Sequence, residues 1–216
     1  MGNLNNMTLN ITEIFYSLQG EAREVGIPTV FVRLTGCPLR CNYCDTAYAF
    51  KGNNPLSIEQ ILAEISKYKT HYVCVTGGEP MAQSNCLGFL DTLIEKGYKV
   101  SMETSGSIDI SKVNKNVSIV MDLKTPSSTE QHQNRYENIA LLENKDQLKF
   151  VIASRLDFDW CCSILEDHKI LSDVLFSPVY ESLKPAQLAD WILEKQLNVR
   201  LQVQLHKILW GDEKGK

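Results

Sequence analysis

The sequence of 216 residues contains no apolar run near the roughly 20 residues that a membrane-spanning helix needs. Positive charge is not in excess either, because 26 acidic residues outnumber 22 lysines and arginines and give a net charge of -4. A dedicated nucleic-acid surface is normally basic. Residues 1–10 lack the basic start and apolar core of a secretory signal. We therefore expect a cytoplasmic protein with no membrane and no nucleic-acid partner.

Cysteine pairs and repeated segments are also missing. The chain has seven cysteines, and four of them, Cys74, Cys86, Cys161 and Cys162, lack the paired spacing of a zinc ribbon. An odd number of cysteines in a chain with an ordinary 44% of hydrophobic residues argues against a disulfide scaffold. With no repeat, low-complexity stretch or long linker, the sequence predicts one domain over residues 1–216, with its core at about 11–210.

Cysteine is concentrated instead in the run Cys37-Pro38-Leu39-Arg40-Cys41-Asn42-Tyr43-Cys44. Three thiolates this close together can bind three irons of a four-iron, four-sulfur cluster and leave the fourth iron open for chemistry. The alternative is a zinc site completed by His71 or Asp45. The absence of a second cysteine pair favours the cluster.

The rest of the chain alternates between short apolar strands and amphipathic helices. Strands are expected at residues 29–36, 71–77, 99–105, 117–123, 147–153, 173–179 and 199–205. Repeated strand–helix–strand units predict parallel strands, in an open doubly wound sheet or a partial barrel. Because the units are fewer than the eight of a complete barrel, we expect an α/β fold that forms an incomplete TIM-like barrel. Residues 10–26 predict an additional N-terminal strand and turn.

Helices are expected between these strands. Ser57 and Gln60 form a capping box at the start of the first one. Pro185 suits the first position of the last one. The remaining helices are expected at residues 85–96, 135–143 and 157–168.

Polar residues gather where the parallel strands end, which is where such folds place their chemistry. The cysteine run follows the first parallel strand, and Thr76-Gly77-Gly78-Glu79-Pro80 follows the second. Two glycines let the backbone approach a ligand closely, and a carboxylate can pair with an ammonium group; the alternative is an ordinary turn. Strand alternation places Ser101, Glu103 and Ser105 on one face. Asp122 and Lys124 also share a face, as ligand contacts or as a mutual salt bridge.

Other polar residues stand where an apolar strand or turn would be ordinary. Arg33 lies in the middle of an apolar strand and needs a partner, either a substrate carboxylate or an internal acid such as Glu79. Gln19 and Glu21 sit in a turn, either as hydrogen-bonding groups for a ligand or as part of an ordinary surface turn. His206 and Lys207 are expected to close the last strand, as substrate contacts or as a core histidine and a solvated lysine.

The cysteine spacing resembles the signature of the radical S-adenosylmethionine superfamily. The resemblance implies a four-iron, four-sulfur cluster on Cys37, Cys41 and Cys44, with S-adenosylmethionine on its open iron. It implies an aromatic contact of Tyr43 with the adenine, and no catalytic side chain beyond the cluster and cofactor. The residues that it assigns to S-adenosylmethionine are Tyr43, Cys44, Asp45, Gly78, Glu79, Glu103, Ser105, Asp122, Leu123 and Lys124.

Further segments resemble one branch, the 7-carboxy-7-deazaguanine synthases of deazapurine and queuosine biosynthesis. The resemblance implies Mg²⁺ bound by Thr46, for which a capping threonine is the alternative. It also implies a pterin site lined by Leu18, Gln19, Gly20, Glu21, Arg33 and Thr76. Ala22 departs from the branch, which has a glycine there. In this branch a radical lyase converts 6-carboxy-5,6,7,8-tetrahydropterin to 7-carboxy-7-deazaguanine with loss of ammonia. A homodimer and a flavodoxin or ferredoxin as electron donor are also expected.

Two rival interpretations remain at this point. A glycyl-radical activase of the same superfamily would share the cysteines and Gly77-Gly78-Glu79, but would not need Gln19, Arg33 and Thr46 as a set. A non-enzymatic zinc or iron–sulfur protein would share the cysteines alone.

Overall fold

The computed structural model describes residues 7–213 and 215–216, whose strands join one sheet. The strand order is β3-β1-β2-β4-β5-β6-β7-β8-β9. The strands span Thr8–Leu18 (β1), Pro28–Leu34 (β2), Pro55–Ser57 (β3), Tyr72–Gly77 (β4), Lys99–Thr104 (β5), Ser118–Asp122 (β6), Gln147–Ile152 (β7), Asp173–Pro178 (β8) and Arg200–Leu201 (β9). From β2 to β9 each strand is parallel to its neighbour, whereas β1 is antiparallel to β2 and β3.

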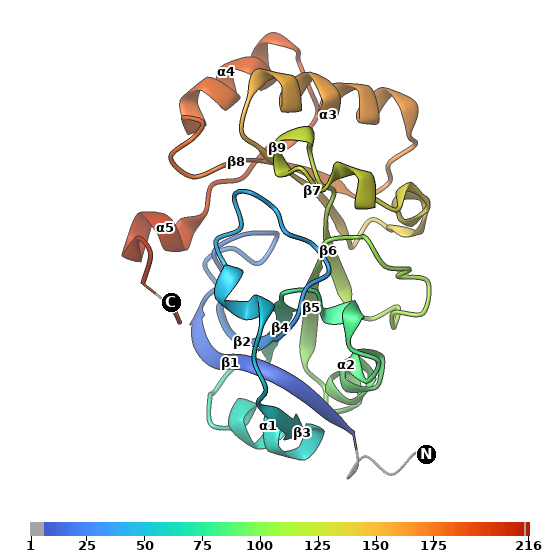
Figure 1. Cartoon of the computed structure of the whole chain (residues 1–216), viewed down its shortest axis with the longest axis vertical. Coiled ribbons are helices and arrows are strands. Elements are labelled where there is room, and N and C mark those ends of the chain that lie inside the picture. Colours follow the sequence, from blue (N-terminus) through green and yellow to red (C-terminus); the bar gives the residue numbers. More distant parts are fainter. Residues whose placement is uncertain (1–6, 214) are drawn as a thin grey trace.

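The sheet is an incomplete barrel (Figure 1). Within the described residues, β3 and β9 are its two edges and do not pair with each other. The predicted partial barrel is therefore confirmed, and so is the additional N-terminal strand, which is β1. The predicted parallel strands begin and end within two residues of the observed ones, except the last.

The described residues form five α-helices, of which α1 to α4 pack against the sheet. They span Ile58–Ile65 (α1), Cys86–Glu95 (α2), Arg155–Asp167 (α3), Pro185–Glu194 (α4) and Leu205–Trp210 (α5). The predicted capping box forms at α1, where the Ser57 hydroxyl accepts from the Gln60 backbone and the Gln60 side chain accepts from the Ser57 backbone. In Figure 1, α3 and α4 lie beside β7 and β8, and α1 and α2 lie toward the other end of the molecule. No helix among these residues is long and apolar enough to cross a membrane.

Two predicted elements differ from the structure. Residues 135–143 were predicted as a helix, but Tyr136–Leu141 form a 3-10 helix (η6). Its Asn138 is fully buried and donates to the carbonyl oxygens of Gly106 and Ile108 at 2.9 and 2.8 Å, so the segment anchors a neighbouring loop. The last strand was predicted over residues 199–205, but β9 ends at Leu201 and Leu205 begins α5. The Leu205 amide donates to the Gly20 carbonyl at 3.0 Å, which turns the chain away from the sheet.

Strand alternation gives the two faces of the sheet different chemistry. One face supplies the core, in which Val32, Met102, Met121 and Phe150 are fully buried against the helices. The residues next to them along the strands point to the opposite, concave face. Those residues include Arg33, Glu103, Asp122 and Lys149, and they line a cavity. The core thus leaves a charged inner surface.

Candidate active site in the half-barrel

An open cavity of about 810 Å³ occupies the concave face at the C-terminal ends of the parallel strands. All the residues predicted for the site line it, except Glu79 and Leu123. The predicted residues that line it are Leu18, Gln19, Gly20, Glu21, Arg33, Cys37, Cys41, Tyr43, Cys44, Asp45, Thr46, Thr76, Gly78, Glu103, Ser105, Asp122 and Lys124. The fold thus brings together segments that are distant in the sequence.

The cysteine loop is fixed by Arg40, which sequence reasoning did not single out. One nitrogen of its guanidinium donates to the carbonyl oxygens of Cys37 and Leu39 at 2.7 and 2.6 Å, and the guanidinium carbon lies 4.4 Å from the Phe50 ring centroid. All three thiols are free and partly exposed to the cavity. Burial raises the pKa of Cys41 to about 11, so a cluster bound there would have to replace the proton of this thiol. Among residues 7–213 and 215–216, no group of three or more histidine, cysteine, aspartate or glutamate side chains could hold a single metal ion.

The glycine turn after β4 packs directly against this loop. A Cβ atom at Gly78 would lie 2.1 Å from the Gly36 carbonyl oxygen and 2.9 Å from the Cys37 Cβ. A Cβ at Gly77 would lie 2.2 Å from the Leu34 carbonyl oxygen, and its φ of 142° favours glycine independently. Only glycines therefore allow the close approach that places this backbone at the cavity wall. The arrangement fits a cluster whose ligand contacts the turn.

Glu79 and Leu123 do not line the cavity, and their contacts with the cofactor stay a prediction. The carboxylate of Glu79 is fully buried and accepts four hydrogen bonds. The donors are the Met81 amide, the Thr104 hydroxyl, and the amide and hydroxyl of Ser105, at 3.0, 2.8, 2.7 and 2.6 Å. Glu79 therefore ties the glycine turn to the end of β5. The Leu123 side chain is fully buried in the core, and its backbone amide donates to the carbonyl oxygen of Lys149 on β7.

Arg33 has an internal partner, but it is not Glu79. Its Nε donates to Oε1 of Glu13 on β1 at 2.7 Å, and the Tyr48 hydroxyl donates to the same oxygen at 2.8 Å. The guanidinium carbon lies 5.6 Å from the Phe15 ring centroid, and Arg33 also lines the cavity. Sequence reasoning missed Glu13, although an acid on a strand facing Arg33 was the signal that could have identified it. The pair orients the guanidinium at the cavity wall.

A second hydrogen-bonded group joins three predicted ligand contacts. The Thr76 hydroxyl donates to Oε2 of Glu103 at 2.7 Å, and the Gln19 side-chain amide donates to Oε1 of Glu103 at 3.5 Å.

Ala22 stands where the resemblance leads us to expect a glycine. Its φ is 65°, so the turn keeps the left-handed backbone conformation that favours glycine, and the residue is buried.

Glu21 is held by two residues that the sequence did not connect with it. Its Oε2 bonds with Nζ of Lys149 on β7, and its Oε1 accepts from the Gln204 amide at 2.8 Å. Lys149 was not predicted for the site, although a lysine inside an apolar strand is the same signal that identified Arg33. Burial by itself would raise the pKa of Glu21, but the charge of Lys149 and the hydrogen bonds from Lys149 and Gln204 together lower it from its ordinary value. The pair is therefore ionised at neutral pH.

Asp122 and Lys124 form the mutual salt bridge that was one of two alternatives, with 3.0 Å between Nζ and Oδ2. The other oxygen, Oδ1 of Asp122, is buried and has no hydrogen-bond partner among the described residues. A buried acceptor of this kind favours a ligand that can donate to it. Nearby, the Tyr43 hydroxyl lies 3.2 Å from that of Thr125 and 3.4 Å from the Val151 carbonyl oxygen.

Thr46 stands at the cap position of a 3-10 helix (η2, Ala47–Phe50), but its side chain makes no capping hydrogen bond. Its hydroxyl lies 3.7 Å from the Cys44 sulfur and faces the cavity with Asp45. His206 and Lys207 also line the cavity, from α5 instead of the predicted strand end. A Cβ at Gly20 would lie 2.4 Å from Nδ1 of His206, which places this ring directly over the turn.

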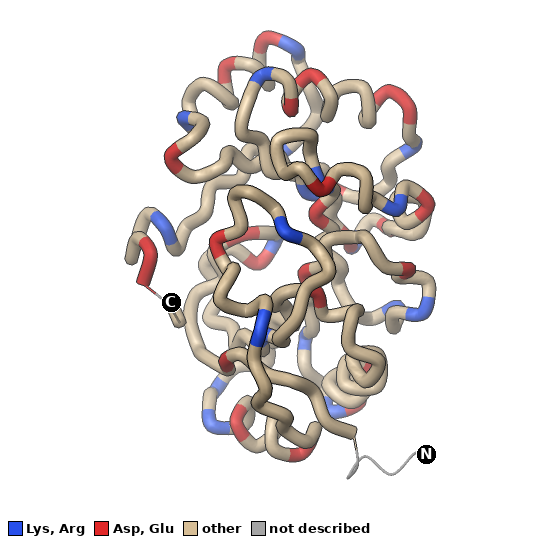
Figure 2. Tube along the Cα trace, viewed as in Figure 1, with Lys and Arg blue, Asp and Glu red and all other residues tan. Residues whose placement is uncertain are grey.

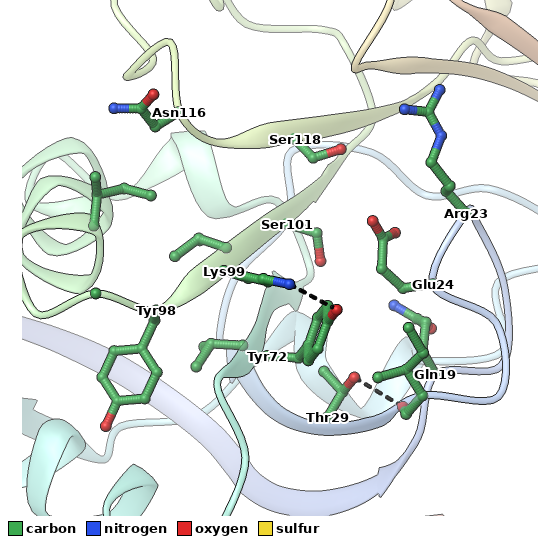
Figure 3. Close-up of a pocket in the computed structure, with 15 residues that line it drawn as sticks. Gln19, Arg23, Glu24, Thr29, Tyr72, Tyr98, Lys99, Ser101, Asn116 and Ser118 are labelled. Carbon is green, nitrogen blue, oxygen red and sulfur yellow. Dashed lines mark hydrogen bonds between the residues drawn. The ribbon is translucent and has the colours of Figure 1, made fainter.

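A second hollow of about 480 Å³ lies at the opposite end of the strands (Figure 3). Tyr72, Lys99, Ser101 and Ser118 line it, and of the residues that the structure describes Gln19 alone lines both hollows. The cysteine loop and the glycine turn are at the larger cavity. Acidic and basic residues are interspersed along the described part of the trace (Figure 2).

Comparisons with known proteins agree with this geometry. Residues 31–142 match the model of the radical SAM superfamily. The chain is 40% identical to the 7-carboxy-7-deazaguanine synthases of Koribacter versatilis and Chlorobaculum tepidum, over 95% of this chain and 98% and 96% of theirs. The crystal structure of QueE from Escherichia coli superposes with a TM-score of 0.72 at 25% identity, over 94% of this chain and 96% of that one. The Streptococcus suis SuiB structure with its precursor peptide shares the fold over 78% of this chain and 46% of its own, at 16% identity and a TM-score of 0.57. The chain belongs to the 7-carboxy-7-deazaguanine synthase family of the radical SAM superfamily.

Proposed function

We propose that the chain converts 6-carboxy-5,6,7,8-tetrahydropterin to 7-carboxy-7-deazaguanine with loss of ammonia, as a Mg²⁺-dependent radical lyase. The observation that carries the proposal is the single cavity that joins the cysteine loop to Gln19, Arg33 and Thr46. The relatives' names support the reaction. The glycyl-radical activase and the zinc protein do not require this set of residues.

The proposed cofactor site is the side of the cavity formed by the cysteine loop and the ends of β4 to β6. Cys37, Cys41 and Cys44 would hold the four-iron, four-sulfur cluster. When bound, the cluster and S-adenosylmethionine supply a 5′-deoxyadenosyl radical that takes a hydrogen atom from the substrate. The residues proposed to position S-adenosylmethionine are Tyr43, Cys44, Asp45, Gly78, Glu79, Glu103, Ser105, Asp122, Leu123 and Lys124.

The proposed substrate site is the opposite side of the cavity. The guanidinium of Arg33, oriented by Glu13, would hold the substrate carboxylate. The Thr46 hydroxyl would contribute one ligand to Mg²⁺, whose octahedron substrate oxygens and water complete. Leu18, Gln19, Gly20, Glu21 and Thr76 would line the pterin ring. These residues supply position and charge, because hydrogen abstraction needs no strong acid or base from the protein.

The partners expected from the sequence belong to this proposal. The partly exposed cysteine loop suits electron transfer from a flavodoxin or ferredoxin at the cavity mouth. A homodimer, action as one domain over residues 1–216 and a cytoplasmic location are parts of the same proposal.

An anaerobic assay of the reconstituted protein tests the function. We expect 7-carboxy-7-deazaguanine from 6-carboxytetrahydropterin, S-adenosylmethionine and a reductant, with no further protein except the electron donor, and more of it with Mg²⁺. Thr46→Ala should lose the response to Mg²⁺, whereas Thr46→Ser, which retains a hydroxyl, should keep it. S-adenosylmethionine cleavage only with a partner protein would favour the activase. Stoichiometric zinc without cluster absorbance would favour the zinc protein.

A further inference from the structure

The turn between β1 and β2 forms part of the cavity wall at the end opposite the cysteine loop. Because β1 is antiparallel to β2, Leu18 at its end lies beside Pro28, where β2 begins. The turn closes on itself through bonds between Gln19 and Ile27 and between Gly26 and Gln19, at 2.9 and 2.8 Å. Gln19 lines both hollows, so the turn separates the cavity from the second hollow.

The turn is fastened to the far half of the sheet. Glu21 reaches Lys149 on β7, which is 128 residues away in the sequence. Arg23 donates to Oδ2 of Asp173 on β8 at 2.7 Å and to the Asn144 carbonyl at 2.9 Å. The two ion pairs differ in environment: the Glu21 and Lys149 side chains are each 14% exposed, whereas those of Arg23 and Asp173 are 40% and 43% exposed. Exposed ion pairs contribute little to stability, so the less exposed pair of Glu21 and Lys149 holds the turn more strongly than the pair of Arg23 and Asp173.

Both oxygens of Glu21 have protein donors, from Lys149 and from Gln204. A carboxylate oxygen has two acceptor sites, so each oxygen can accept one further bond from a ligand in the cavity. Burial alone would lower the pKa of Lys149, but the charge of Glu21, and then that of Asp122, raise it. The lysine therefore keeps its charge beside the carboxylate.

We propose that Lys149 is a positioning residue that holds the carboxylate of Glu21, and through it residues 19–21, in the geometry that binds the pterin. The proposal rests on the function proposed above. It assigns Lys149 no contact with the reacting atoms. A lysine that contacted only the ligand would leave the turn fastened when it was removed.

Two measurements test the proposal, and one of them does not depend on the function. The first is the affinity of the reconstituted protein for 6-carboxypterin, a fluorescent, fully oxidised analogue that cannot undergo the reaction. The second is the rate of trypsin cleavage after Arg23, which reports how firmly the turn is held. In Lys149→Met we expect affinity weaker by about tenfold, as for loss of a charge-assisted hydrogen bond, and faster cleavage after Arg23.

Two variants serve as controls. Lys149→Arg keeps the charge and should bind 6-carboxypterin nearly as tightly as the wild type, with Arg23 protected. Asp173→Asn removes only the exposed pair and should leave 6-carboxypterin affinity unchanged within about twofold. If Lys149→Met does not fold, Glu21→Gln replaces it, because it keeps the shape and removes the ion pair; the same two effects are expected.

The proposal is overturned if Lys149→Met binds 6-carboxypterin as tightly as the wild type, or if Arg23 stays as protected. It is also overturned if Lys149→Arg is as impaired as Lys149→Met, because charge would then not be the reason. Failure of the function would look different: the wild type itself would neither bind 6-carboxypterin nor convert the substrate. The trypsin comparison would then still decide whether Lys149 fastens the turn.

Discussion

At the scale of single residues, Gly20 is required by space and not by backbone conformation. The His206 ring would lie 2.4 Å from a Cβ at this position. We predict that Gly20→Ala pushes the ring away and lowers the free energy of unfolding by about 1–3 kcal/mol, as overpacking does. Urea unfolding of the cluster-free protein measures this.

Gly88 provides the control for that substitution. It lies inside α2, and the nearest atom to its Cβ would be the flexible methyl of Met7 at 3.3 Å. Gly88→Ala should therefore leave stability unchanged or raise it by up to about 1 kcal/mol, because alanine is the better helix former. Equal effects of the two substitutions would contradict the steric argument for Gly20.

Glu79 gives a second prediction at this scale. Its buried carboxylate accepts from four donors. Glu79→Gln would turn an amide group toward donors such as Ser105, so we expect a loss of about 2–3 kcal/mol of unfolding free energy, as for hydrogen bonds to a charged group. Urea unfolding without S-adenosylmethionine separates this role from cofactor binding. A variant as stable as the wild type would show that the carboxylate does not organise the turn.

At the scale of elements, the start of α1 depends on a local signal. Ser57→Ala removes the hydroxyl that accepts from the Gln60 amide at 3.2 Å, and we predict a loss of about 1 kcal/mol of unfolding free energy. Thermal unfolding of the apo-protein measures it, and Ser57→Asp, which keeps an acceptor, should restore most of the loss. No difference between Ser57→Ala and Ser57→Asp would show that the cap contributes nothing here.

Elements with such local signals could be predicted from the sequence. The apolar strands, the capping box and the proline at the start of α4 depend on neighbouring residues alone. The elements that differed depend on distant contacts: Asn138 serves a loop some 30 residues earlier, and Leu205 bonds to Gly20 near the other end of the chain. A window of the sequence contains no information about such partners.

At the scale of the whole molecule, the same distinction separates the predicted site from its supports. Residues with polar side chains at strand ends were predicted, and the cavity contains nearly all of them. Their partners were missed: Glu13 faces Arg33 from the neighbouring strand β1, and Lys149 reaches Glu21 from β7 across the half-barrel. A motif gives the order of residues around Glu79 but not the direction of its side chain, which accepts hydrogen bonds from Thr104 and Ser105.

His206 of α5 lies over the turn at Gly20, and its protonation predicts how the stability of the protein depends on pH. Burial lowers the pKa of His206, although Glu21 and Asp45 oppose the shift and Lys207 adds to it. The unfolded chain therefore takes up this proton first, at a pKa of about 6.5. Neutral His206 contributes its full share of the free energy of unfolding above pH 6.5. This share is lost as the pH falls from 6.5 toward the lowered pKa that His206 has in the folded protein. Urea unfolding between about pH 7.5 and 5.5 should show a decline that is smaller in His206→Gln, whereas His132→Gln, at an exposed position, should decline like the wild type. An unchanged decline in His206→Gln would assign the pH dependence to other groups.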